Sequence, residues 1–280
     1  MSPFELVEPR TLGDAIAALD AREGAVRPMS GATALMLMMK AGVLRPARLV
    51  SLRKLNLDSI SNGKDGVLVV GAMTTLRELE RSAAVKEGWP VITRALRTLS
   101  NVRVRNVATV GGALAHADPH MDLPPLLSAL GARATIAGPQ GERSAPIESL
   151  YAGYLENTLR RGELITHIEI PPLGKRRAAY LKCTTRSADD WPALGMAVVL
   201  DGGEARIWVS AATDKPTRLL AAEKILKGQI TDEKALRQAG AAAAEEVHIE
   251  SDLHGSADYK KQLIRVYLAR AVHEARNAVH

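Results

Sequence analysis

A short stretch near the middle of the chain, ATVGGALAHADPHMDLP (108–124), concentrates residue types that bind ligands. The residues of these types are Gly111, Gly112, His116, Asp118, His120 and Asp122. Glycines lack a Cβ and let backbone amides approach a phosphate, whereas closely spaced histidines and carboxylates are typical metal ligands. The stretch therefore indicates two different chemistries, a phosphate site or a metal site.

The phosphate interpretation is supported by a second glycine loop nearer the N-terminus. MSGATALM (29–36) is predicted to run from a strand through Gly31 into a helix capped by Thr33, and TVGGAL offers a similar loop starting at Thr109. Amides at a helix N-terminus point at an anion, and the helix dipole favours negative charge there. Neither loop matches a Rossmann or P-loop pattern. The two loops can clamp one diphosphate only if the fold brings them together.

The metal interpretation rests on His116 and His120, whose i, i+4 spacing would place both rings on one helix face. Pro119 lies between them and disfavours a helix at Asp118. The other histidines are scattered along the chain, at positions 167, 248, 254, 273 and 280. We therefore predict no metal site, with a metal-dependent hydrolase centred on HADPHMD as the weaker alternative.

Helix and strand signals around these loops predict an α+β protein. EPRTLGDAIAALD predicts a helix capped by Thr11, GVLVVG contains a strand, and Thr75 with Glu78 forms a capping box for the next helix. Asp122 is expected to cap the helix in LPPLLSALG, and ARATIAGPQGERSAP predicts a hairpin. The Pro, Gly and charged residues of PPLGKRR (171–177) indicate a domain boundary.

Beyond that boundary, strands are predicted in AAYLKCTTR, PALGMAVVL and ARIWVSAAT, the last two joined as a hairpin, and helices close the chain. Lys182 and Cys183 are adjacent in a strand and should face opposite sides. In the last helix, 258–279, one face is predicted to consist of Tyr259, Leu263, Val266, Tyr267 and Ala271.

Composition excludes several classes of function. The formal charge of +6 on 280 residues is spread evenly, and only nine residues are aromatic, so we predict no nucleic-acid binding. The single cysteine, Cys183, rules out an internal disulfide and a Cys-ligated iron–sulfur cluster held by this chain alone. The chain has no apolar run of membrane-spanning length and no signal-like N-terminus, so we predict a cytoplasmic protein without a transmembrane segment.

Several of these motifs together resemble a known family. MSGATALMLMMKAG and TVGGALAHADPHMDLP are similar to the two flavin loops of the FAD-binding medium subunits of molybdenum hydroxylases. The likeness continues through VVGAMTTLRELE, GELITHIEIP and YLKCTTRSADDWPALGMAVVL, and so covers nearly the whole chain in order. The group includes the flavin subunit of aerobic carbon monoxide dehydrogenase and the flavin domain of xanthine dehydrogenase.

The resemblance implies an FAD site without catalytic side chains. The first loop would wrap the FAD diphosphate and the second would contact it from the other side, while Asp122 would accept a hydrogen bond from a flavin hydroxyl. Leu164 and Ile165 would lie against the isoalloxazine ring, and Lys182 would approach its polar edge. Ala113 stands where the family usually has Asn, which removes one contact. The implied FAD-binding residues are Arg27, Pro28, Met29, Ser30, Gly31, Ala32, Thr33, Ala34, Val104, Ala108, Thr109, Gly111, Gly112, Ala113, Asp118, Asp122, Leu164, Ile165 and Lys182.

The resemblance also implies an architecture and partners. The fold would be a two-part FAD-binding domain of the vanillyl-alcohol-oxidase type, residues 1–174 with subdomains of about 1–55 and 56–174, followed by a smaller α+β domain at 175–280. A large subunit would hold the molybdopterin cofactor and a small one the [2Fe-2S] clusters, in an (αβγ)2 assembly. FAD would pass electrons from the clusters to NAD, oxygen or a quinone. The alternative is a stand-alone flavin- or nucleotide-binding regulatory protein.

Overall fold

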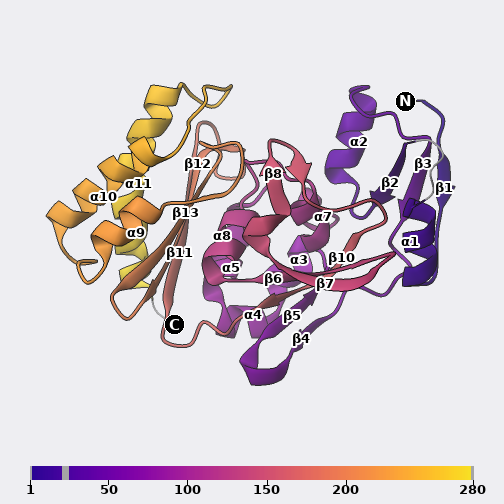
Figure 1. Cartoon of the computed structure of the whole chain (residues 1–280), viewed down its shortest axis with the longest axis horizontal. Coiled ribbons are helices and arrows are strands. Elements are labelled where there is room, and N and C mark those ends of the chain that lie inside the picture. The colour runs from indigo at the N-terminus through magenta and orange to yellow at the C-terminus, as the bar shows by residue number, and fades with distance from the viewer. Residues whose placement is uncertain (1, 21–24, 279–280) are drawn as a thin grey trace.

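The computed structural model describes residues 2–20 and 25–278 and spreads them along one long axis, with the N-terminal segments at one end and the C-terminal helices at the other (Figure 1). Helices and mostly antiparallel sheets alternate along this axis, which confirms the predicted α+β class. Within the described ranges, no helix is long and apolar enough to cross a membrane.

Short parallel strands at the N-terminal end carry the first glycine loop. The strands pair in the order β1 (Glu5–Val7), β3 (Arg48–Ser51) and β2 (Val26–Met29), and the helices beside them are α1 (Leu12–Asp20) and α2 (Thr33–Lys40). Thr11 Oγ1 accepts a hydrogen bond from the Asp14 amide at 3.1 Å, which confirms the predicted cap of α1. The small core of this region includes Leu164, from the middle of the chain.

The middle of the molecule is an antiparallel sheet covered by helices. Its strand order is β4 (Ile60–Asn62), β5 (Leu68–Gly71), β10 (Leu164–Ile170), β6 (Arg133–Gly138) and β7 (Gly141–Pro146). The helical segments are η1 (Lys64–Gly66), α3 (Leu76–Arg81), α4 (Ala83–Gly88), α5 (Pro90–Thr98), α6 (Val102–Arg105), α7 (Val110–Ala115), α8 (Leu123–Leu130) and η2 (Ile147–Leu150). The Thr75–Glu78 capping box and the β6–β7 hairpin are both present, as predicted.

A small hairpin, β8 (Tyr151–Gly153) with β9 (Glu156–Asn157), projects from the middle region. We call residues 151–159 the arm. It stands beside α7, opposite the N-terminal region (Figure 1). The arm therefore faces α2 across the part of the molecule that holds both glycine loops.

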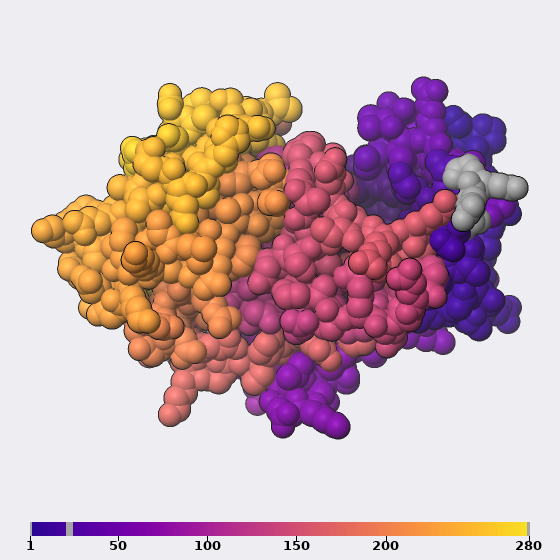
Figure 2. Space-filling model, in the orientation of Figure 1, coloured from indigo at the N-terminus to yellow at the C-terminus, as the bar shows by residue number. Residues whose placement is uncertain are grey.

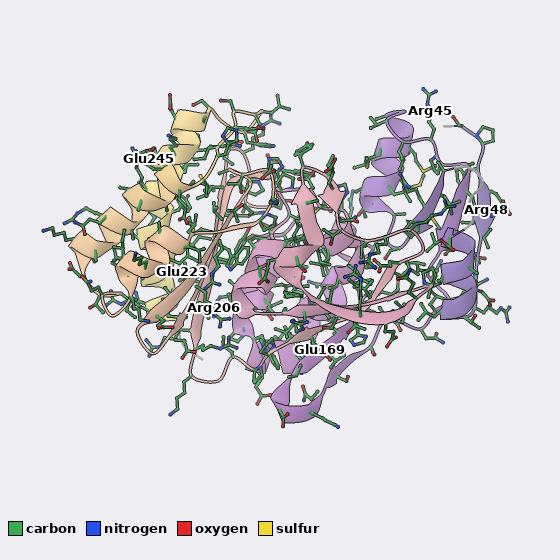
Figure 3. All side chains as sticks on the ribbon, in the orientation of Figure 1. Arg45, Arg48, Glu169, Arg206, Glu223 and Glu245 are labelled. Carbon is green, nitrogen blue, oxygen red and sulfur yellow. The ribbon has the colours of Figure 1, made fainter. Side chains whose placement is uncertain are left out.

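The C-terminal region is a sheet with helices on both faces. Its strands pair in the order β11 (Arg177–Thr184), β12 (Pro192–Asp201), β13 (Glu204–Ser210) and β14 (Thr217–Arg218), and α9 (Leu220–Leu226), α10 (Glu233–Glu246) and α11 (Ala257–Asn277) follow. Helix α11 packs on β11 and β12, and α8 of the middle region packs on β12 and β13. Glu223 (Figure 3) fixes α9 to the sheet by accepting a hydrogen bond from the Ile207 amide at 2.8 Å.

The face predicted for the last helix is only partly buried, with Leu263 and Tyr267 packed against the C-terminal core, and the fully buried face is displaced from it by about one position. Tyr259 is 44% exposed, and the residues that α11 buries are Lys260, Ile264, Leu268, Ala271, Val272 and Ala275. Only Ala271 belongs to both sets. Counting apolar residues missed this face because its first member is a lysine, which the pattern treats as a solvent residue.

Lys260 is buried because the fold supplies partners for its charge. Its side chain is 2% exposed, and Nζ lies 2.6 Å from Asp252 Oδ2 and donates to the Ala211 carbonyl at 2.9 Å. Asp252 also lies 3.1 Å from His120 Nε2, and the Ala211 amide donates to the Pro119 carbonyl. This polar network therefore joins the C-terminal helices to the loop that follows α7.

We expect Asp252→Ala to lower the free energy of unfolding by about 3–5 kcal/mol, because it leaves a buried ammonium without its counter-ion. The measurement is urea denaturation followed by circular dichroism. The matched control is Glu245→Ala, which breaks exposed pairs with Lys261 and Arg265 and should cost less than about 1 kcal/mol. Equal losses in the two variants would contradict a special role for the Asp252–Lys260 pair.

Candidate functional site

The two glycine loops lie against each other although they are far apart in the sequence. Ser30 and Thr109, 79 positions apart, share a hydrogen bond between their hydroxyl oxygens at 2.5 Å, and Ser30 also donates to Met73 Sδ. A Cβ on Gly31 would lie 2.1 Å from the Val107 carbonyl oxygen. Only glycine allows this approach of one backbone to the other. The fold thus meets the condition for a clamp built from both loops.

The second loop is held in place from behind by the strand β5 and the turn that follows it. Gly111 donates its amide to the Ala72 carbonyl at 2.8 Å, and a Cβ at Gly111 would meet Ala72 Cβ at 2.6 Å. Thr109 caps α7 by accepting a hydrogen bond from the Gly112 amide at 3.1 Å. Because these amides already have protein partners, this loop contributes mainly an open surface without side chains.

The first loop, in contrast, presents free helix amides. The N-cap residue of α2 is Ala32, in a left-handed conformation with φ of 57°, and no side chain in residues 2–20 and 25–278 caps this end. Thr33 is the first helical residue, so the prediction that it caps the helix is wrong. The first amides of a helix have no intrahelical partner. Those of Thr33, Ala34 and Leu35 lie at the wall of a cleft, where an anion can accept their hydrogen bonds.

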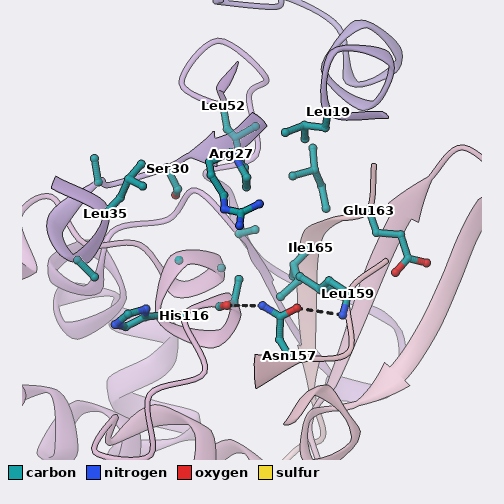
Figure 4. Close-up of a pocket in the computed structure, with 18 of the residues that line it drawn as sticks. Leu19, Arg27, Ser30, Leu35, Leu52, His116, Asn157, Leu159, Glu163 and Ile165 are labelled. Carbon is teal, nitrogen blue, oxygen red and sulfur yellow. Dashed lines mark hydrogen bonds between the residues drawn. The ribbon is translucent and has the colours of Figure 1, made fainter. Parts of the chain in front are cut away.

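This cleft, about 870 Å³ in volume, runs between the N-terminal region, α7 and the arm (Figure 4). Figure 2 shows the molecular surface hollowed between the N-terminal region and the magenta segment that contains the arm. The volume is in the range of small-molecule and cofactor sites. The predicted residues that line it are Arg27, Pro28, Ser30, Gly31, Ala32, Thr33, Ala34, Gly111, Gly112, Leu164 and Ile165.

Arg27 supplies a positive charge inside the cleft. Figure 4 shows its guanidinium directed between the Ser30 loop and Asn157. Within the described ranges its side chain makes a hydrogen bond only to the neighbouring Val26 carbonyl, at 3.3 Å, and no ion pair is formed. Together with the α2 amides, this guanidinium makes the cleft suitable for a diphosphate.

The remaining predicted residues lie outside the lining of the cleft. Thr109 is buried beneath it and bonds to Ser30, and the Ala108 backbone packs against Gly31. These two residues thus shape the cleft from behind. The other predicted residues that do not line it are Met29, Val104, Ala113, Asp118, Asp122 and Lys182.

Asp122 and Lys182 bind each other at the contact between α8 and the C-terminal sheet. Lys182 Nζ lies 3.4 Å from Asp122 Oδ2, the Tyr180 hydroxyl donates to Asp122 Oδ1 at 2.6 Å, and the Asp122 and Lys182 side chains are each 6% exposed. Asp122 occupies the N-cap position of α8, as predicted, but its side chain makes no capping hydrogen bond because the carboxylate is turned towards the sheet. Burial raises the pKa of Asp122, and Lys182 and Tyr180 oppose that rise.

Cys183 lies on the other side of β11, 3.9 Å from the Tyr259 hydroxyl, which confirms the predicted alternation.

The histidines and Asp118 do not form a metal centre. In residues 2–20 and 25–278, no group of three or more His, Cys, Asp or Glu side chains is placed to hold a metal ion. Asp118 instead accepts hydrogen bonds from the His120 amide and lies 2.9 Å from His120 Nδ1. His116 follows α7 and lines the cleft, and burial lowers its pKa. His120 therefore stabilises the loop after α7 through Asp118, whereas His116 lies at the cleft.

An arginine just before the second loop is structural. Arg105 is buried and pairs with Glu80 at 3.0 Å. It also donates to the Leu99 and Ser100 carbonyls. Its charge is consequently used inside the helical layer and not at the cleft.

Most of the far wall of the cleft is not among the residues predicted from the sequence. This wall includes Asn157, Leu159, Arg160, Arg161 and Glu163. Glu163 is fixed there by Arg143, whose guanidinium donates to both carboxylate oxygens at 2.8 and 2.7 Å and, through its hydrogen bond, lowers the Glu163 pKa. The only local signal in the sequence is the polar run before the strand that begins at Leu164.

Comparison with known proteins gives consistent matches along the chain. Residues 2–173 match the family described as the FAD binding domain in molybdopterin dehydrogenase, and residues 179–275 match the CO dehydrogenase flavoprotein C-terminal domain. The chain is 29% identical to the glyceraldehyde dehydrogenase medium chain of Sulfolobus acidocaldarius, over 97% of this chain and 98% of that one. It is 32% identical to the carbon monoxide dehydrogenase medium chain of Afipia carboxidovorans, over 98% and 96%.

A solved structure has nearly the same backbone. A chain of reconstituted CO dehydrogenase from Oligotropha carboxidovorans superposes with a TM-score of 0.93 at 31% identity, and the match covers 99% of each chain. The likeness includes the order of all the regions described above.

We expect Gly31→Ala to destabilise the protein by about 1–3 kcal/mol, because the new methyl group would overlap the Val107 carbonyl. Denaturant unfolding measures the loss. Gly13→Ala is the control, since Gly13 lies in α1 and, apart from its own stretch of helix, no described atom lies within 4 Å of an added Cβ. That variant should be neutral or more stable by up to about 1 kcal/mol. An unchanged Gly31→Ala protein would show that the loops need not touch.

Proposed function

This chain belongs to the FAD-binding medium subunits of the molybdenum hydroxylases, and on that basis we propose that its cleft holds FAD and that the subunit relays electrons from [2Fe-2S] clusters of a partner to a final acceptor. The observation that carries the proposal is the uncapped N-terminus of α2, open to a cleft between two glycine loops. FAD, when bound, supplies reversible electron transfer.

In this proposal the chain itself contributes position and charge. The amides of Thr33, Ala34 and Leu35 bind the diphosphate, and the Arg27 guanidinium offsets its charge. Gly111 and Gly112 leave room for the diphosphate on the opposite side. Leu164 and Ile165 offer an apolar wall for a flat ring. The roles of Asp122 and Lys182 at the flavin stay predictions, as do the domain limits at 174 and 175.

The proposal extends to the assembly. The relatives are named as medium chains, which implies multi-subunit enzymes. We propose that this chain joins a large molybdopterin subunit and a small iron–sulfur subunit in an (αβγ)2 assembly in the cytoplasm. A stand-alone flavin-binding regulator would instead purify alone with FAD and pass no electrons to another chain.

Arg27→Glu should weaken FAD binding about tenfold or more, because it replaces the favourable charge beside the diphosphate with a repulsive one. Equilibrium titration followed by flavin fluorescence measures the change. Riboflavin, which has no phosphate, should bind both proteins equally. Arg94→Glu is the charge-matched control, since Arg94 is exposed on α5 outside the cleft. An Arg27→Glu protein that binds FAD like the parent would argue against a diphosphate at this position.

The electron relay is tested in the complex. When this chain is co-expressed with the large and small subunits of the proposed assembly, we expect the three to co-purify, and the absorbance of the oxidised flavin to bleach when substrate of the large subunit is added without oxygen. Adding NAD, oxygen or a quinone in turn then identifies the acceptor by recovery of the absorbance. A flavin that stays oxidised while the iron–sulfur signal is reduced would refute the relay.

A further inference from the structure

The outer part of the arm, residues 152–158, forms a wall of the cleft that is attached mainly through hydrogen bonds. Ala152, Leu155, Glu156 and Asn157 all line the cleft. The arm turn is exposed, with Tyr154 59% and Leu155 38% accessible to solvent. Between the two ends of the arm, where Tyr151 and Leu159 pack against the core, the wall therefore depends on polar contacts for its position.

Asn157 makes the contact that joins this wall to α7. Its Nδ2 donates to the Ala115 carbonyl at 2.6 Å, and its Oδ1 accepts from the Leu159 amide at 3.0 Å (Figure 4). One end of the side chain must therefore donate and the other must accept. Only a carboxamide does both in this geometry, because a carboxylate has no N–H to offer and an aliphatic side chain has neither group.

A second hydrogen bond lies beside the first and joins backbones that are strained. The Leu155 amide donates to the Ala117 carbonyl at 3.1 Å, and both residues have a left-handed backbone with φ of 56°. Residues other than glycine keep this conformation only when their surroundings hold them in it. The hydrogen bond of Asn157 therefore stabilises the neighbouring Leu155–Ala117 contact, whose two left-handed residues would otherwise favour other backbone conformations.

The partner of Asn157 is also the helix that carries the second glycine loop. Helix α7 has Gly111 and Gly112 in its first turn and Ala115 at its last position, and it is about 9 Å long. Fixing its last carbonyl to the arm thus fixes the distance between the glycine loop and the opposite wall. On the outer side, Lys215 Nζ donates to the Ala152 carbonyl at 3.2 Å and holds the arm to the C-terminal region.

We propose that Asn157 is a positioning residue that sets the width of the FAD cleft by tying the arm to the end of α7. The proposal rests on the assignment of the cleft to FAD. Without the Nδ2–Ala115 bond the arm moves away from α7, water enters along the Leu155 side, and bound FAD leaves faster.

The test compares Asn157→Asp with Thr158→Ala in the full chain. The aspartate keeps the acceptor for Leu159 but faces the Ala115 carbonyl with a second oxygen, whereas Thr158→Ala removes an exposed arm contact, Oγ1 to the Ser149 carbonyl, that does not involve α7. We expect FAD to dissociate about tenfold faster from Asn157→Asp, with higher flavin fluorescence while bound, and less than twofold faster from Thr158→Ala. Equal FAD dissociation rates and equal fluorescence in the two variants would overturn the proposal.

Hydrogen exchange on the FAD-free chain tests the positioning role of Asn157 independently of whether the cleft binds FAD. The Leu155 amide should exchange faster in Asn157→Asp than in the parent, at similar melting temperature, while amides of α10 stay unchanged. Unchanged exchange at Leu155 would overturn the positioning role even if FAD binds. A parent chain that holds no FAD in its complex would instead refute the proposed function, whatever the exchange result.

Discussion

The structure depends on the close approach of two backbone segments, where the Gly31 loop lies on the Val107–Ala108 backbone without room for a Cβ. This contact brings the exposed end of α2 and the capped end of α7 to the same cleft, one offering amides and the other a smooth surface. The shared hydrogen bond of Ser30 and Thr109 then holds both loops together. The shape of the cleft is therefore set by contacts within the protein itself.

Away from the cleft, charged side chains with little solvent exposure fix the position of the C-terminal region against the middle region, which apolar packing alone would define less strictly. Asp122 and Lys182 lie where α8 meets β11, and the Asp252–Lys260 pair lies where α11 meets the loop after α7. Each charge has a partner, which makes the arrangement tolerable in a poorly solvated place and specific in its geometry. Sliding of the C-terminal region against the middle region would separate Asp122 from Lys182 and His120 from Asp252 at once.

Local signals were enough to predict the elements and the glycine loops. The capping box at Thr75, the hairpin at 133–146 and the turn at Gly31 are each encoded within a few residues, and the structure contains all of them. Side-chain partners were not predictable in this way. Asp122 finds Tyr180 and Lys182 at separations of 58 and 60 residues, and Lys260 occupies a core position that hydrophobic periodicity assigns to an apolar residue. The far wall of the cleft was missed for the same reason, because only the fold brings Asn157 to Ala115.

The N-terminal region also has a consequence for synthesis on the ribosome. Its core needs Leu164, and its glycine loop needs the Val107 backbone, so both contacts join residues far apart in the sequence. Such contacts form late, since the intervening chain must close a long loop first. The first fifty residues therefore leave the ribosome before their partners exist, and their apolar surface stays exposed until more than half of the chain has been made. Chaperone binding to the nascent N-terminus is the expected result of this topology.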